Sequence, residues 1–296
     1  MPQPIMEQLP KNCKSVLVER YTTTVFEEPV NVIHWVLRHI QPTPIFTLEI
    51  VEDATPVSEF DCRIVSVKKE RRLHSFDTQA PMKGHYLALA CPIDVDFDEQ
   101  RASETIMFSV NMLRLFFGES FCEQRHNKSL YTLEKGSWAI TQTSPVYGSF
   151  PETSVFQFSK LSGDTFAHSG LAVTTTAIRL FDLAVAENQQ IDLRFILLWT
   201  AFEAQLGSFP GKSSGDRRKA FATKLASPQI NDELFYLFKE KRNVYLKEPE
   251  HAQITFRDYH SLRQAFMISA IAGSSDQKEA AQEYIDWLTE NPSDGD

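Results

Sequence analysis

The 296-residue sequence lacks long apolar runs and paired cysteines. No apolar run is long enough for a membrane helix, and the N-terminus lacks the basic-then-apolar pattern of a signal peptide. The cysteines are widely spaced, with no C-x-x-C pair, at Cys13, Cys62, Cys91 and Cys122. This spacing predicts reduced, structural thiols rather than a disulfide framework. Together these absences predict a cytoplasmic protein that does not contact a membrane.

Motifs for metals and nucleotide cofactors are also missing. The histidines show neither H-E-x-x-H nor another paired-ligand spacing, and His34 and His39 lie in an apolar-aromatic stretch typical of structural histidines. The acidic run at 94–99 lacks the glycine and distal glutamate of a calcium loop, so it indicates a solvated turn before a helix. Neither G-x-x-x-x-G-K-[ST] nor G-x-G-x-x-G occurs. We therefore expect no metal site and no cofactor.

Positive charge is scarce as well. The chain has 30 basic and 39 acidic residues, a net charge of −9 and a pI near 5.4. This balance argues against broad, charge-driven binding to nucleic acid or to anionic membranes. Any contact with RNA must then come from a local basic patch. The hydrophobic content of 42% and charged content of 23% are those of a globular protein.

The first half of the chain has the alternating pattern of strands. Strands are predicted at 14–22, 45–51, 60–69, 85–91, 138–144 and 154–159. One helix is predicted from Ser103 to Phe117, with Gly118 at the place of a C-cap glycine. The polar, turn-rich region 119–136 is predicted to be a loop. These elements predict an α+β domain over residues 1–164, with a mostly antiparallel sheet plus a helix.

The second half changes to a period near 3.6 residues. Helices are predicted around 171–185, at 192–206 with Asp192 as its cap, at 216–226, at 231–248 with Asn231 as its cap, at 256–272, and at 276–290 opened by Asp276 and Glu279. The connections between them are short. Residues 165–296 are therefore predicted to form an all-α helical bundle.

The helix at 231–248 carries the most informative residues. Its apolar stripe, predicted to face inward, consists of Leu234, Phe235, Leu237, Phe238 and Tyr245. Arg242 and Asn243 lie beside this stripe, close to the point where Pro249 ends the helix. A cation and an amide held on a rigid helix are suited to binding phosphate.

Glu203 falls on the edge of the apolar face of the 192–206 helix. An unpaired carboxylate is costly to bury, so Glu203 should either reach solvent or meet a cation. Arg242 is the natural partner, and Arg194 and Arg217 are the alternatives.

A family resemblance rests on three stretches in a fixed order. They are W-T-A-F-E-A-Q-L, D-R-R-K-A-F-A-T-K-L-A and L-F-K-E-K-R-N-V-Y-L. This order resembles the HEPN domains (higher eukaryote and prokaryote nucleotide-binding domains) of the ApeA-like group, found in many prokaryotic defence proteins. I-M-F-S-V-N-M-L-R-L-F-F-G-E is similar to a helix in the N-terminal region of that group. The resemblance covers roughly residues 165–290 and, more loosely, 100–120, and it implies a HEPN-like bundle.

Active members of that family carry an arginine, a polar residue that is often asparagine, and a histidine four to six residues after the arginine. Arg242 and Asn243 fit the first two places, but the histidine place holds Lys247. His251 follows later, beyond Pro249. Histidine can act as acid or base near neutral pH, whereas lysine would need a strongly lowered pKa to act as a base.

Two functions stay open. One is an RNA-acting HEPN protein of a prokaryotic defence or toxin-type system, a metal-independent endoribonuclease in which Arg242 and Asn243 hold phosphate. Lys247 or His251 would then fill the missing role. The other is an inactive HEPN module that binds a protein partner or nucleotide, with the N-terminal domain recognising a ligand or trigger.

The basic residues nearby are expected to contact RNA or phosphate, namely Arg217, Arg218 and Lys241. The resemblance also implies a homodimer through the 231–248 helix, and a protein partner from the same system. A purely structural alternative stays open, in which Arg242 only pairs with Glu203 inside the bundle.

Overall fold

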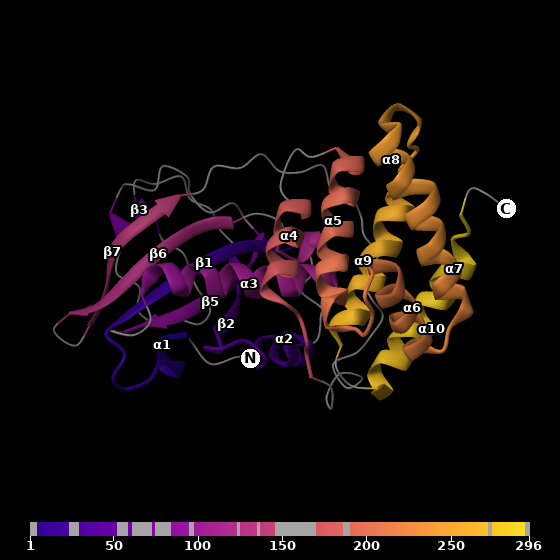
Figure 1. The fold of residues 1–296 in the computed structure, drawn as a ribbon. Helices are drawn as coiled ribbons and strands as arrows, with labels where there is room; N and C mark the ends of the chain where they lie inside the picture. Colours follow the sequence, from indigo (N-terminus) through magenta and orange to yellow (C-terminus); the bar gives the residue numbers. More distant parts are fainter. Residues whose placement is uncertain are drawn as a thin grey trace. The chain divides into compact units, whose positions relative to one another are not determined.

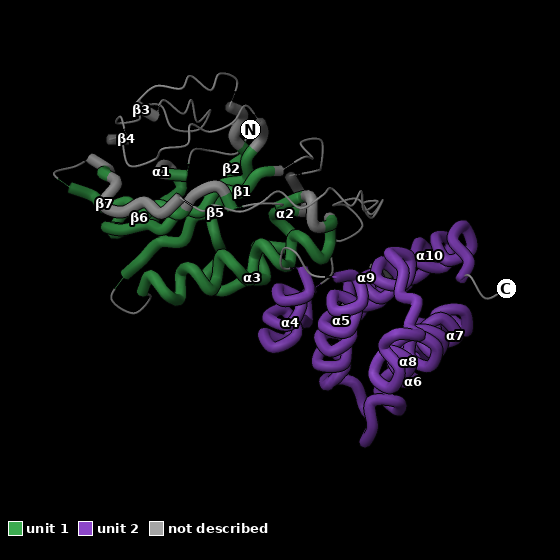
Figure 2. Tube along the Cα trace, turned by 90° about the horizontal axis from the view of Figure 1, so that it is seen from above, with its two compact units in different colours: residues 1–157 green, residues 158–296 purple. Residues whose placement is uncertain are grey.

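The computed structural model divides the chain into two compact units, residues 1–157 and 158–296, coloured green and purple in Figure 2. It describes residues 5–23, 30–51, 59–60, 73–74, 84–94, 98–122, 125–134, 137–145, 170–185, 190–271 and 274–293. The predicted boundary at 164/165 lies outside these described residues.

Unit 1 contains an antiparallel sheet. Its strands are β1 (Ser15–Thr23), β2 (Ile45–Val51), β5 (Gly84–Ile93), β6 (Arg125–Glu134) and β7 (Ser137–Pro145). These described strands form a five-stranded sheet in the order β2-β5-β1-β6-β7, and each neighbouring pair is antiparallel (Figure 1). A short separate pair joins β3 (Glu59–Phe60) to β4 (Leu73–His74). The predicted antiparallel sheet is confirmed.

One long helix packs on this sheet. The helical elements of unit 1 are α1 (Ile5–Gln8), α2 (Val30–Leu37), α3 (Glu99–Phe117) and the 3₁₀ turn η1 (Glu119–Cys122). The helix α3 contacts β1 and β5. Its end at Gly118 is confirmed, because Gly118 adopts φ +94° and donates its N–H to the carbonyl of Arg114. It begins four residues before the predicted start, because the Asp98 side chain accepts the N–H of Arg101 at 2.9 Å and caps it.

The predicted loop at 119–136 is wrong, because residues 125–134 form strand β6. This strand pairs with β1 on one side and with β7 on the other. The ladder hydrogen bonds on both sides outweigh its polar composition. Of the other predicted strands, 60–69 lies outside the described residues except for Phe60 in β3, and 154–159 lies outside them entirely.

A buried carboxylate connects the sheet to α3. Glu19 in β1 is 1% exposed and accepts hydrogen bonds from the hydroxyls of Tyr21 (2.7 Å) and Ser103 (3.1 Å). It also forms an ion pair with Arg125 at 3.4 Å. Burial, and then the nearby Glu19 charge, raise the pKa of Tyr21 well above its ordinary value. This network satisfies the carboxylate and explains why polar residues occur in the sheet interior.

Three described cysteines, Cys13, Cys91 and Cys122, are free and buried, which agrees with the predicted reduced thiols; Cys62 lies outside the described residues. Burial raises the pKa of both Cys91 and Cys122 to about 12.

Because the thiolate is the reactive species, we expect Cys91 and Cys122 to stay unmodified when the native protein is treated with iodoacetamide at pH 7.5. The same treatment in 8 M urea should alkylate both, which peptide mass spectrometry would detect. Alkylation of either thiol in the native protein, at the rate seen in urea, would contradict the burial in this sheet.

In its described part, unit 2 is made of helices joined by short connections, with one isolated antiparallel β-bridge between Leu171 and Ile271. Its elements are α4 (Thr175–Val185), α5 (Ile191–Gln205), η2 (Leu206–Ser208), α6 (Ser214–Leu225), α7 (Pro228–Tyr236), η3 (Leu237–Arg242), α8 (Asn243–Lys247), η4 (Pro249–His251), α9 (Phe256–Ala270) and α10 (Ser274–Glu290). The buried helix α9 packs against α5 and α10 (Figure 1). The coarse prediction of an α+β part followed by a helical part is confirmed.

The predicted helix caps are wrong in detail. The helix α5 begins at Ile191, so Asp192 lies in its first turn and is not its cap. The helix α7 begins at Pro228, and the side chain of Ser227 caps it by accepting the N–H of Ile230 at 3.2 Å. Ser227 prevails over Asn231 because a proline at the first helical position already has the φ angle that a helix needs. The predicted cap Asp276 likewise lies within α10, which begins at Ser274.

Among the described residues, no helix is both long and apolar enough to cross a membrane.

Candidate functional site

The segments α7, η3 and α8 follow one another without a break, and the middle segment is a π-helix. The N–H of Asn243 bonds to the carbonyl of Phe238, five residues back instead of the usual four. Such widened turns are rare and occur frequently at functional sites. Here the turn contains or adjoins Lys241, Arg242 and Asn243, three of the residues predicted to bind phosphate.

The predicted apolar stripe on this helix is only partly correct. Leu234 and Leu237 are buried, and Phe238 and Tyr245 are half-buried. Phe235 is 61% exposed and lies next to Lys239, whose ammonium is 5.9 Å from the centre of its ring. It misses the interior because it lies one position past the buried Leu234, a rotation of about 100° around the helix.

Two arginines meet the same aromatic ring. The guanidinium carbon of Arg218, on α6, lies 3.7 Å from the ring centre of Phe238, and that of Arg242 lies 5.5 Å from it. Arg218 also lies 5.4 Å from the ring of Trp199, a buried residue of α5 that packs against Phe238. We call Trp199, Arg218, Phe238 and Arg242 the arginine–aromatic cluster. Cation–π attraction holds both guanidiniums close to the ring.

The cluster holds hydrogen-bond donors without acceptors. Among the described residues, neither Nη1 of Arg218 nor Nε1 of Trp199 has a hydrogen-bond partner, although both atoms are buried. Burial lowers the pKa of Arg218, the charge of Glu203 raises it, and the charge of Arg242 lowers it. Buried donors are nearly always satisfied in proteins, so these two call for an acceptor such as a water or a ligand oxygen.

Glu203 does not form the expected ion pair with Arg242, although both residues lie in the described part of the chain. Its carboxylate accepts a hydrogen bond from the hydroxyl of Ser214 at 2.5 Å, and Arg218 is the cation whose pKa it affects. Arg242 instead donates to the side-chain oxygen of Asn243 at 2.9 Å. The structural alternative, in which Arg242 is neutralised by Glu203 inside the bundle, is therefore wrong.

The two alternative partners of Glu203 are also engaged elsewhere. Arg194 donates to the carbonyl of Ala184 at 3.1 Å and lies over the ring of Tyr259. Arg217 donates to the carbonyl of Gly211 at 3.3 Å.

Lys241 points to a different side of the helix from the cluster. Its ammonium donates to the carbonyl of Gln253 at 2.7 Å and lies 3.2 Å from a carboxylate oxygen of Asp258. Burial lowers the pKa of Lys241, but hydrogen bonding to Tyr236 and the charge of Asp258 outweigh it, so the pKa is raised overall. Lys241 thus stays protonated at neutral pH and cannot act as a base.

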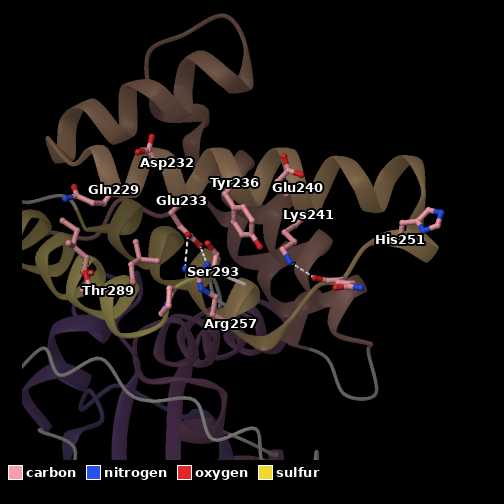
Figure 3. A pocket seen from close by; sticks show the side chains of 14 residues that line it. Gln229, Asp232, Glu233, Tyr236, Glu240, Lys241, His251, Arg257, Thr289 and Ser293 are labelled. Carbon is pink, nitrogen blue, oxygen red and sulfur yellow. Dashed lines mark hydrogen bonds and ion pairs between the residues drawn. The ribbon is translucent and has the colours of Figure 1, made fainter. Parts of the chain in front are cut away.

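Lys241 forms part of a groove of about 960 Å³ (Figure 3). The lining residues are Gln229, Asp232, Glu233, Tyr236, Glu240, Lys241, His251, Gln253, Arg257, Ile285, Leu288, Thr289, Pro292 and Ser293. In Figure 3, Glu233 and Arg257 are joined by dashed lines below the helix, and Asp232 and Glu240 point away from them. Arg242 does not line this groove.

The two residues expected to fill the histidine role lie at the end of the helix. Lys247 is exposed. The His251 side chain is 67% exposed, with Nε2 4.0 Å from a carboxylate oxygen of Glu250. His251 lines the groove with Lys241. The structure therefore brings Arg218 and Arg242 together, and it groups His251 with Lys241 instead.

The arginine–aromatic cluster is suited to binding phosphate. Guanidinium groups bind phosphate oxygens bidentately, and they remain protonated at any physiological pH. Arginines that lie against aromatic rings are also typical of single-stranded nucleic-acid sites. Among the described residues, no group of three or more histidine, cysteine, aspartate or glutamate side chains could hold a metal ion.

One motif in this region has a structural role. Gly211–Gly215 has the spacing G-x-S-x-G of a hydrolase nucleophile turn. That motif requires a strand before the serine, but the preceding element here is η2. The hydroxyl of Ser213 accepts the N–H of Asp216, and the Asp216 carboxylate accepts the N–H of Ser213. Ser213 is therefore the cap of α6 and not a nucleophile.

Trp199 and Phe238 carry no local signal in the sequence that marks them as parts of a site. Both lie in apolar helical stripes, where an aromatic residue is typical of the core. Phe238 and Arg218 are on separate helices, and no local spacing relates them.

Comparison with models of known protein families, with curated proteins and with solved structures gave no match for this chain.

Proposed function

We propose that unit 2 is a HEPN-like module of a prokaryotic defence or toxin-type system that binds RNA through the arginine–aromatic cluster. The observation that carries this proposal is the convergence of Arg218 and Arg242 on the ring of Phe238, with Nη1 of Arg218 buried and lacking an acceptor in the described part of the chain. An RNA phosphate supplies both the charge and the acceptor oxygens. The family resemblance supports RNA as the polymer that carries the phosphate.

The geometry supports binding better than cleavage. Cleavage without a metal needs a base for the 2′-hydroxyl beside the cation that stabilises the developing charge. Within one chain, His251 lines the groove with Lys241, and Lys247 is exposed at the end of α8. Among the described residues, Arg218 and Arg242 contact the ring of Phe238 and the side chain of Asn243, not these two side chains.

A metal-independent endoribonuclease is the second candidate function, favoured by one specific observation. The charge of Glu203 raises the pKa of Arg218, so a carboxylate acts on the cluster electrostatically, and carboxylates are among the groups that serve as general bases. A second copy of the chain, docked through the α7–η3–α8 helix, is the proposed assembly. Phe235 and Leu246 on that helix are 61% and 54% exposed.

We expect Arg242→Ala and Arg218→Ala each to weaken the binding of single-stranded RNA on the order of tenfold, because each removes a phosphate contact. Each substitution should also reduce, by about one, the magnitude of the slope of the logarithm of the RNA-binding constant against the logarithm of the salt concentration. The measurement is fluorescence anisotropy with a labelled RNA of 20 nucleotides in EDTA. Lys278→Ala, which removes an exposed cation from α10, is the matched control and should bind like the wild type. Wild-type protein that fails to bind RNA, or an Arg242→Ala variant that binds normally, would rule out the cluster as the RNA site.

Incubation of the same proteins with total RNA and tRNA in EDTA separates the two candidate functions. Binding without cleavage is the expected result for the wild type. Cleavage that survives EDTA and is lost in both Arg242→Ala and Glu203→Gln would instead establish the ribonuclease.

A further inference from the structure

Two neighbouring residues of the π-helical turn, Lys241 and Arg242, point to different sides of the helix. Arg242 lies beside Phe238 in the arginine–aromatic cluster. Lys241 points to the groove, where its ammonium meets Asp258 at 3.2 Å and the carbonyl of Gln253 at 2.7 Å. The side chains of Lys241 and Asp258 are only 10% and 2% exposed. An ion pair so well shielded from water is much less screened than a surface pair.

Asp258 is itself held rigidly at the start of α9. One carboxylate oxygen accepts the N–H of Thr255 at 2.8 Å and its hydroxyl at 2.9 Å. The hydroxyl of Thr255 in turn accepts the N–H of Asp258, which completes a capping box. Lys241 therefore forms its ion pair with a carboxylate whose orientation is already set by the capping box of the buried helix α9.

The widened turn needs such an anchor. A π-turn interrupts the regular hydrogen-bond pattern of the helix and has poorer intrinsic stability than an α-turn, so side-chain contacts must favour it. The turn extends from Leu237 to Arg242, and the hydrogen bond from Asn243 to Phe238 closes it. Both Phe238 and Arg242 lie within this turn, so a change of the turn to α-helical geometry would alter the position of Arg242 relative to the ring. The contacts of Lys241 with Asp258 and Gln253 oppose that change.

We propose that the Lys241–Asp258 ion pair is a positioning device that holds the π-turn so that Arg242 stays in the RNA site. This inference rests on the proposed function of the cluster. It assigns Lys241 a role different from the direct RNA contact predicted from the sequence. Lys241 and Asp258 act through Arg242 and do not touch the ligand.

The direction in which Asp258→Asn changes RNA affinity shows whether Lys241 contacts RNA directly or positions Arg242. If Lys241 contacts RNA directly, removal of a neighbouring negative charge frees the ammonium and leaves RNA binding unchanged or tighter. If the pair positions Arg242, the same substitution weakens RNA binding, by about the tenfold expected for loss of one phosphate contact. We expect the weakening. Asp232→Asn, which removes an exposed carboxylate from α7, is the control and should not weaken binding.

A double-mutant cycle identifies the residue through which the pair acts. In the Arg242→Ala background, Asp258→Asn should have no further effect on RNA affinity, because the group that it positions is already absent. Lys241→Met keeps the capping box of α9 intact, so it is the second variant and should behave like Asp258→Asn in both backgrounds. Lys241→Arg, which can still pair with Asp258, should restore most of the affinity. Thermal unfolding establishes that each variant is folded at the temperature of the assay.

The outcomes separate this inference from the function on which it rests. Wild-type protein that does not bind RNA overturns the proposed function. If the wild type binds and Arg242→Ala does not, but Asp258→Asn binds as tightly as the wild type, the positioning role is overturned. Equal weakening by Asp258→Asn in the wild-type and Arg242→Ala backgrounds also overturns it, because that result indicates a general loss of structure.

Discussion

Replacement of Glu233 by alanine is expected to lower the free energy of unfolding of unit 2 by roughly 3–5 kcal/mol. Glu233 is 8% exposed and forms an ion pair with both terminal nitrogens of Arg257, one of them at 3.0 Å. It also accepts the hydroxyl of Ser261 at 2.7 Å, and that hydroxyl lies 2.7 Å from the hydroxyl of Tyr284. Removal of the carboxylate leaves the Arg257 charge, only 18% exposed, without its partner. It also deprives the buried hydroxyls of their acceptor.

Urea unfolding of the full chain measures the loss in free energy of unfolding. Hydrogen exchange of the amides in α9 and α10 then shows whether the loss is located in these helices. Asp232→Ala is the matched control, because Asp232 is the exposed neighbour on the same helix and its loss should change stability by less than about 0.5 kcal/mol. A loss below about 1 kcal/mol in Glu233→Ala would show that the network contributes little to stability.

Mild acid is expected to destabilise unit 2 through the buried side chain of His260. His260 on α9 is 7% exposed and packs against Trp287, with ring centres 4.8 Å apart. Burial, and then the charge of Arg263, lower the pKa of His260 from 6.5 to about 3. The unfolded chain therefore binds a proton near pH 6.5, and the folded chain does not bind it until about pH 3.

Because the unfolded state binds more protons over this window, the free energy of unfolding falls as the pH falls below 6.5. The slope attributable to this residue is about 1.4 kcal/mol per pH unit, or on the order of 3 kcal/mol between pH 6.5 and 4.5. Urea midpoints measured from pH 7.5 to 4.5 give this slope. His260→Gln should remove it, whereas His251→Gln, at a side chain that is 67% exposed, should leave it unchanged. The same slope in wild type and His260→Gln would assign the acid sensitivity to other groups.

The sequence determined the elements whose signals are local. Gly118 ends α3 as predicted, because a residue with φ of +94° is almost always glycine. Alternation in the first half and a 3.6-residue period in the second were sufficient to predict the antiparallel sheet and the helical part, since both reflect which side chains are buried. The same local patterns identified Arg242 and Asn243 as residues at a helix end.

Tertiary structure decided the features that depend on contacts between residues far apart in the sequence. Strand β6 exists because β1 and β7 pair with both of its edges, although its own composition is that of a loop. Phe238 is part of the arginine–aromatic cluster only because a separate helix, α6, places Arg218 against its ring. A regular helix was the expectation for residues 237–242, and the structure has a π-turn there instead, at which Lys241 forms an ion pair with Asp258 of α9. The site therefore follows from long-range packing within unit 2, whereas most helices of unit 2 and most strands of unit 1 follow from periodicity along the chain.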